Sequence, residues 1–106
     1  MSRDPRVGEA YFEDPLVLTK ASVRLGASIL SAQKRVLNSL EVLAIPTIVI
    51  HGGEDHLVPT MCSQALTTVP CVVRRVLPEL RHEALNEPEG PEVVGEIIDW
   101  IVSKTA

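Results

Sequence analysis

The sequence predicts an α/β fold of parallel strands with flanking helices, in a sheet that the chain leaves incomplete. Two short apolar runs predict strands: Thr47–Ile50 is continuous, as in a strand covered by helices on both faces, while Val72–Leu77 contains Arg74 and Arg75, which indicate that one side is closer to solvent. Helical patterns precede, separate and follow these runs, which implies parallel pairing through a right-handed crossover. Two strands alone expose both sheet edges. We therefore expect this chain to be part of a larger sheet or to need a partner.

The segment before the first strand predicts one long helix. Residues 1–14 are polar and show no periodicity, and Asp14 followed by Pro15 is typical of a helix start. Apolar residues at helical spacing then predict a helix from roughly Lys20 to Leu43. Pro46 ends this helix, because the residue before a proline is pushed out of the α region.

Two further helices are expected after the first strand. Gly52 and Gly53 allow a sharp turn, and Thr60 is expected to cap a short helix that ends near Thr68. Asn86 with Glu89 three positions later resembles a capping box. The helix behind it carries an apolar stripe and, with Trp100, is expected to pack in the core; the stripe consists of Val93, Val94, Ile97, Ile98 and Ile101.

Composition narrows the class of protein. The 106 residues suffice for one domain with a modest core, and a net charge of −4 argues against binding nucleic acid. Apolar stretches fall far short of the ~18 residues of a membrane span, so we expect a cytoplasmic protein without a spanning segment. Cys62 and Cys71 lack zinc-type spacing and are interpreted as free thiols, with a disulfide between them left open.

An acid and a histidine follow the two predicted strands. Asp55 lies on the glycine-rich turn after the first strand, and His82 follows the second strand at a distance of 27 positions along the chain. Both strands should deliver these side chains to one edge of the sheet. An acid paired with a histidine forms two thirds of a nucleophilic triad, and the order matches that of a Ser, Asp, His sequence. We therefore predict that Asp55 and His82 are catalytic.

Other interpretations of these residues remain open. Asp55 also suits a turn in which the carboxylate binds its own backbone. A metal site of His51, Asp55 and His56 is disfavoured, because their spacing fits no zinc pattern. Glu54 and Glu83 are candidates for supporting the acid and the histidine, although solvated carboxylates are the simpler interpretation.

No serine in this sequence occupies a nucleophile elbow, which requires glycines two positions before and two positions after the serine. Ser28 has Gly26 before it but Leu30 after it. The sequence contains seven serines, namely Ser2, Ser22, Ser28, Ser31, Ser39, Ser63 and Ser103.

From Asp4 onward the chain resembles the C-terminal third of a bacterial monoacylglycerol lipase or lysophospholipase of the α/β-hydrolase superfamily. The pieces that carry the resemblance are Tyr11-Phe12-Glu13-Asp14-Pro15-Leu16, His51-Gly52-Gly53-Glu54-Asp55 with Val58-Pro59, and Arg81-His82-Glu83 with Asn86-Glu87-Pro88-Glu89. In such a protein they are the end of a helical cap, the acid turn and the histidine loop.

The resemblance implies two segments and an activity. Residues 1–44 would be the end of the cap with a connecting helix, and residues 45–106 the C-terminal part of the core. Tyr11, Phe12 and Leu16 would belong to the cap, where they could line an acyl pocket. The chain would act with Asp55 and His82 on glycerol or lysophospholipid esters, without a cofactor, and would contact membranes through its substrate.

The nucleophile, the oxyanion loop and the first strands would come from an N-terminal hydrolase half or a partner chain. The 106 residues alone are therefore predicted to be inactive. Two alternatives remain: a truncated, non-catalytic remnant that docks onto another chain, and part of another α/β-hydrolase such as an epoxide hydrolase.

Overall fold

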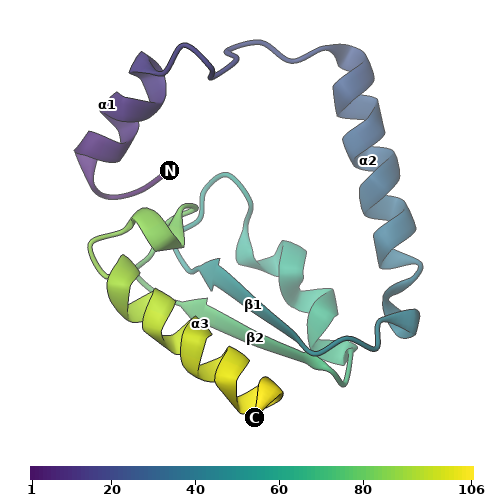
Figure 1. Ribbon diagram of the computed structural model, residues 1–106. Coiled ribbons are helices and arrows are strands. Elements are labelled where there is room, and N and C mark those ends of the chain that lie inside the picture. Colours follow the sequence, from purple (N-terminus) through teal and green to yellow (C-terminus); the bar gives the residue numbers. More distant parts are fainter.

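A computed structural model describes residues 1–106 as one pair of parallel strands with the later helices packed beside them, while the first two helices form an arch that stands away from the strands (Figure 1). Strands β1 (Thr47–Gly52) and β2 (Val72–Leu77) pair in parallel, with Thr47 opposite Val72 and Gly52 opposite Leu77. The 3₁₀ helix η2 (Thr60–Thr68) connects them. The prediction of parallel neighbouring strands is confirmed, and β1 runs two residues farther than expected.

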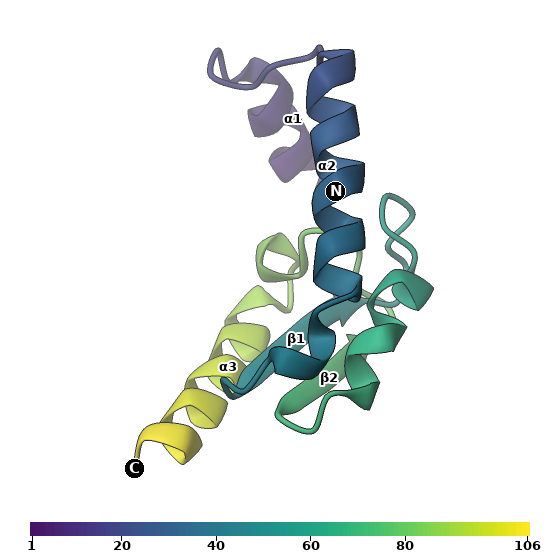
Figure 2. The same ribbon diagram turned by 90° about the vertical axis from the view of Figure 1, so that its right-hand side faces the viewer.

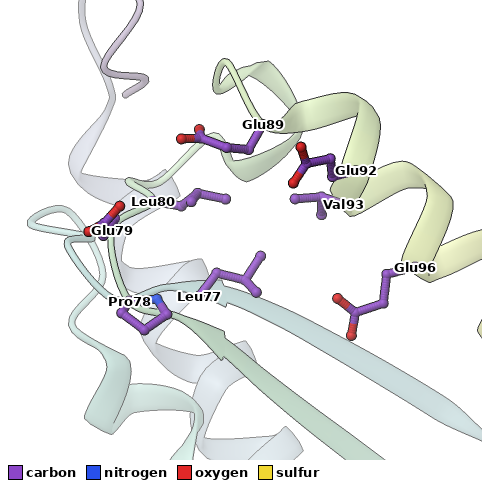
Figure 3. A pocket seen from close by; sticks show the side chains of 8 residues that line it. All are labelled: Leu77, Pro78, Glu79, Leu80, Glu89, Glu92, Val93 and Glu96. Carbon is purple, nitrogen blue, oxygen red and sulfur yellow. The ribbon is translucent and has the colours of Figure 1, made fainter.

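The final helix, α3 (Gly90–Thr105), lies on one side of the strands, and η2 lies on the other (Figure 2). Leu80, Ala84 and Val93 form the buried core, with Leu77 packed against them (Figure 3). The apolar stripe of α3 is buried only in part, because Val93 is buried while its other members are half-buried or exposed.

The sheet is incomplete, as predicted. It contains two strands, and β1 has no neighbour on its outer edge. Only 10 of 106 residues are buried, so the core is far smaller than the apolar content of the chain allows. Exposed apolar side chains concentrate on α2 and α3, which therefore present faces without a partner.

The first helices differ from the prediction. Helix α1 spans Pro5–Glu13, within residues predicted to be irregular, and Asp4 caps it by accepting the Arg6 N–H at 2.9 Å. Asp14, predicted to start a helix, ends this one. Its carboxylate does accept the Leu16 N–H at 2.8 Å, but no helix follows.

Helix α2 spans Val23–Leu37 and is shorter than predicted at both ends. Ser22 caps its start by accepting the Leu25 N–H. Asn38 forms its C-cap, with its backbone N–H donating to the Lys34 and Val36 carbonyl oxygens, and a short 3₁₀ helix, η1 (Leu40–Val42), follows. Pro46 therefore precedes β1 without ending a helix.

Two predicted caps are also wrong. Helix η2 has the predicted extent, but Thr60 does not cap it. Asn86 and Glu89 form no capping box, because the Asn86 amide donates to Glu83 and the Glu89 carboxylate pairs with Arg3. Both cysteines are free thiols. No helix is long and apolar enough to cross a bilayer.

Candidate active site

Asp55 and His82 meet beyond the carboxyl ends of β1 and β2. The Nδ1–H of His82 donates a hydrogen bond to Oδ2 of Asp55 at 2.8 Å, although 27 positions separate the two residues. The Asp55 side chain is 3% exposed and that of His82 is 42% exposed. The predicted hydrogen bond between acid and histidine is therefore present.

The carboxylate of Asp55 is held by its own turn. Its Oδ1 accepts the backbone N–H groups of Leu57 and Val58, both at 2.9 Å. Burial opposes the charged form and raises the pKa of Asp55, but the hydrogen bonds from Val58, His82 and Leu57 outweigh burial and lower the pKa from 3.8 to about 2. The turn interpretation and the acid interpretation thus hold together, because one oxygen binds the turn and the other binds the histidine.

The protons on His82 follow from this pairing. A carboxylate oxygen only accepts, so Nδ1 carries the hydrogen and the neutral ring presents its lone pair at Nε2. The ring makes no hydrogen bond other than the one to Asp55. A small hollow of about 190 Å³ lies beside it, lined by Ile50, His51, Gly52, Asp55, Val58 and His82. Nε2 is therefore suited to take a proton from an incoming group.

Gly52 and Gly53 allow the acid turn to approach the histidine loop closely. The chain turns at Gly53 and Glu54 as expected, but neither glycine has a positive φ, so the turn does not use the left-handed region open to glycine. A Cβ on Gly52 would overlap the carbonyl oxygens of Leu80 and Arg81, and one on Gly53 would lie 2.7 Å from the Cα of Pro78. The two glycines do matter for the site, because their lack of a side chain lets the acid turn and the histidine loop touch.

His51 is hydrogen-bonded to the acid turn and stabilises it. Its Nε2–H donates to the Val58 carbonyl oxygen at 2.8 Å and lies 3.4 Å from Oδ2 of Asp55. Its Nδ1 lies 2.7 Å from Oγ of Ser63, which accepts a hydrogen bond from Nε of Arg74 at 2.8 Å. This buried polar chain ties the turn to η2 and β2, a role that the sequence did not reveal.

The remaining candidates lie apart from the pair. Glu54 is exposed and lies 3.6 Å from His56, while Glu83 binds Asn86. No cluster of three or more His, Cys, Asp or Glu side chains is arranged to hold a metal ion. Tyr11 and Phe12 lie on α1 and are exposed, as is Leu16 after it.

A larger hollow of about 350 Å³ lies between the end of β2 and the start of α3 (Figure 3). Four glutamates line it around the apolar side chains of Leu77, Leu80 and Val93, and Figure 3 labels them Glu79, Glu89, Glu92 and Glu96. Two of these carboxylates are paired with arginines, Glu89 with Arg3 and Glu96 with Arg75. The hollow includes neither Asp55 nor His82.

Parallel strands that deliver an acid and a histidine to one sheet edge define the C-terminal part of an α/β-hydrolase fold. The chain belongs to the family described as Serine aminopeptidase, S33, which matches residues 1–89. It thus belongs to a family of serine hydrolases.

The chain is similar to two monoacylglycerol lipases. It is 34% identical over 107 residues to that of Mycolicibacterium smegmatis, a match covering 97% of this chain and 38% of that protein. The crystal structure of the Paleococcus ferrophilus monoacylglycerol lipase matches with a TM-score of 0.88 at 28% identity, covering 95% of this chain and 41% of that one. The chain therefore spans less than half the length of either relative.

Proposed function

We propose that this chain supplies the acid and the histidine of a Ser-Asp-His triad in a carboxylester hydrolase resembling a monoacylglycerol lipase or lysophospholipase. The observation that carries the proposal is the 2.8 Å hydrogen bond from Nδ1 of His82 to Oδ2 of Asp55, which leaves Nε2 free. The similarity to two monoacylglycerol lipases supports glycerol esters as the substrate class.

In this mechanism Nε2 of His82 removes the proton of a serine hydroxyl as its oxygen attacks the ester carbonyl carbon. The Asp55 carboxylate stabilises the imidazolium that forms and keeps the ring oriented. His82 then returns the proton to the alcohol leaving group, and water releases the acyl group from the serine. No cofactor takes part.

The nucleophile and the oxyanion donors come from residues outside these 106, in an N-terminal hydrolase half or a partner chain. Support comes from the two-stranded sheet and from the exposed apolar faces of α2 and α3, which need a covering surface. Residues 1–44 then form the end of the cap, and residues 45–106 belong to the core. A substrate of this class brings the enzyme to membrane surfaces.

A chimera tests the proposal. The aligned part of this chain replaces the corresponding segment of the Mycolicibacterium smegmatis lipase, and hydrolysis is measured against a monoacylglycerol, a lysophospholipid and an epoxide. We expect hydrolysis of the glycerol ester, with a loss of about 10³-fold or more in kcat on Asp55→Asn or His82→Ala. The isolated 106-residue chain should release no fatty acid. A folded chimera that retains full activity after His82→Ala would refute the triad assignment, and one that opens only the epoxide would refute the ester substrate.

A further inference from the structure

Glu87 is a buried carboxylate that the proposed proton transfer does not use. Its side chain has no exposed surface, so its charge needs partners inside the protein. Oε1 accepts the Arg81 N–H at 2.9 Å, and Oε2 accepts Nε–H of Arg3 at 2.9 Å. The backbone N–H of Arg3 also reaches both oxygens at 3.1 Å. Burial raises the pKa of Glu87, but these bonds from Arg81 and Arg3 lower it below its ordinary 4.5.

The two partners of Glu87 are far apart in the sequence, one near the N-terminus and one in the histidine loop. Arg3 precedes Glu87 by 84 positions and lies just before α1, while Arg81 directly precedes His82. The guanidinium of Arg3 extends onward to Glu89, and the Ser2 hydroxyl donates to the Asn86 carbonyl oxygen at 2.8 Å. The N-terminal segment therefore lies against the histidine loop.

The peptide groups on the two sides of Arg81 are restrained by two different residues, Glu87 and Gly52. The N–H of Arg81 is bound by Glu87, and its carbonyl oxygen lies so close to Gly52 that a Cβ added there would overlap it. That carbonyl belongs to the peptide bond that leads into His82. Restraining both groups fixes the position of the His82 backbone. The hydrogen bond from the His82 side chain to Asp55 depends on that position.

We propose that Arg3 and Glu87 are positioning residues that hold the loop before His82 so that its imidazole meets Asp55. A guanidinium paired with a carboxylate is directional as well as strong, which suits it to fixing a loop. Because Arg3 lies next to α1, the pair couples the placement of α1 to that of the histidine. The inference rests on the proposed function only for the catalytic role of His82.

Hydrogen exchange of the full chain, read by mass spectrometry, tests this proposal and tolerates self-association. Arg3→Gln removes the guanidinium but keeps the Arg3 backbone N–H. We expect exchange in the peptide that covers residues 81–84 to rise through the Arg81 amide, which Glu87 binds and which should exchange about tenfold faster, while residues 47–52 stay protected. Exchange at the imidazole C2 of His82 should move toward that of His56, which is exposed.

Arg6→Gln is the matched control, since Arg6 lies on the same segment and its side chain is 85% exposed. It should leave both signals unchanged. If Arg3→Gln also speeds exchange at residues 47–52, the variant has disturbed the whole fold, and Arg3→Lys is measured instead. Arg3→Lys keeps the positive charge and loses only the forked geometry of the guanidinium. We expect it to cause an intermediate increase in exchange at residues 81–84.

Exchange at residues 81–84 and at His82 within twofold of the unchanged protein in both Arg3 variants would overturn the proposal, as would an equal effect of Arg6→Gln. The readout is the placement of His82 and not hydrolysis. An inactive chimera with a protected His82 would therefore refute the proposed function and leave this inference standing.

Discussion

A Cβ added to Gly52 would overlap the carbonyl oxygen of Arg81, so no side chain fits between these two residues. This contact brings the acid turn and the histidine loop together. Gly52→Ala should therefore destabilise the fold by about 1–3 kcal/mol through overpacking, which urea unfolding followed by Trp100 fluorescence measures. Gly95→Ala is the control: its Cβ meets nothing within 4 Å, and the change should stabilise α3 by roughly 0.5–1 kcal/mol. Equal effects of the two changes would contradict the contact.

Asp55 has two separable functions, one for each oxygen. Asp55→Asn keeps a carbonyl oxygen for the Leu57 and Val58 N–H groups, whereas Asp55→Ala leaves both unpaired and should cost about 1–3 kcal/mol more in the free energy of unfolding. Asp55→Ala should also remove the hydrogen bond to His82, whereas the Asp55→Asn amide can only donate to Nδ1 and therefore favours the tautomer that has its hydrogen on Nε2. Equal stability of the two variants would show that the turn does not depend on Oδ1.

Acid should weaken the contribution of Asp55 to stability. Its pKa is lowered from 3.8 to about 2 on folding, so the folded state favours the ionised carboxylate. This contribution is fully present above pH 3.8 and is lost as the pH falls through about 2. The stability difference between the unchanged protein and Asp55→Asn should therefore shrink between about pH 5 and about pH 2 in urea titrations. A difference that is constant across this range would argue against a perturbed Asp55.

His51 should matter for the acid turn although it is not a proposed catalyst. His51→Ala leaves the Val58 carbonyl and Oγ of Ser63 without this partner, which should cost about 1–3 kcal/mol and speed amide exchange over residues 53–58. His56→Ala is the matched control, because that side chain is 80% exposed and should contribute little. Similar exchange in both variants would rule out a supporting role for His51.

The sequence predicted the strands and the Asp55–His82 pair well because local signals determine them. A short run rich in Val, Ile and Leu marks each strand, and polar residues follow each strand end. An Asp followed by Pro occurs at Asp4 and again at Asp14, and only the first of the two starts a helix. Asp4 leads into good helix formers such as Glu9 and Ala10, whereas Asp14 is followed by Val17 and then Thr19, and β-branched residues favour helix less.

The contacts of Glu87 and His51 could not be predicted from sequence. Arg3 and Glu87 lie 84 positions apart, and no periodicity links them. His51 belongs to the pattern around the acid, but its partner Ser63 lies on η2 and only the folded chain brings the two together. Buried polar contacts of this kind depend on tertiary structure, so local patterns do not report them.

The most direct test of the Asp55–His82 pair is fluorophosphonate labelling of the chimera with the Mycolicibacterium smegmatis lipase. Labelling requires a serine activated by a histidine base. We predict one labelled serine outside residues 1–106, with labelling lost on His82→Ala and retained on His56→Ala. Labelling that survives His82→Ala, or that occurs on a serine within these 106 residues, would contradict it.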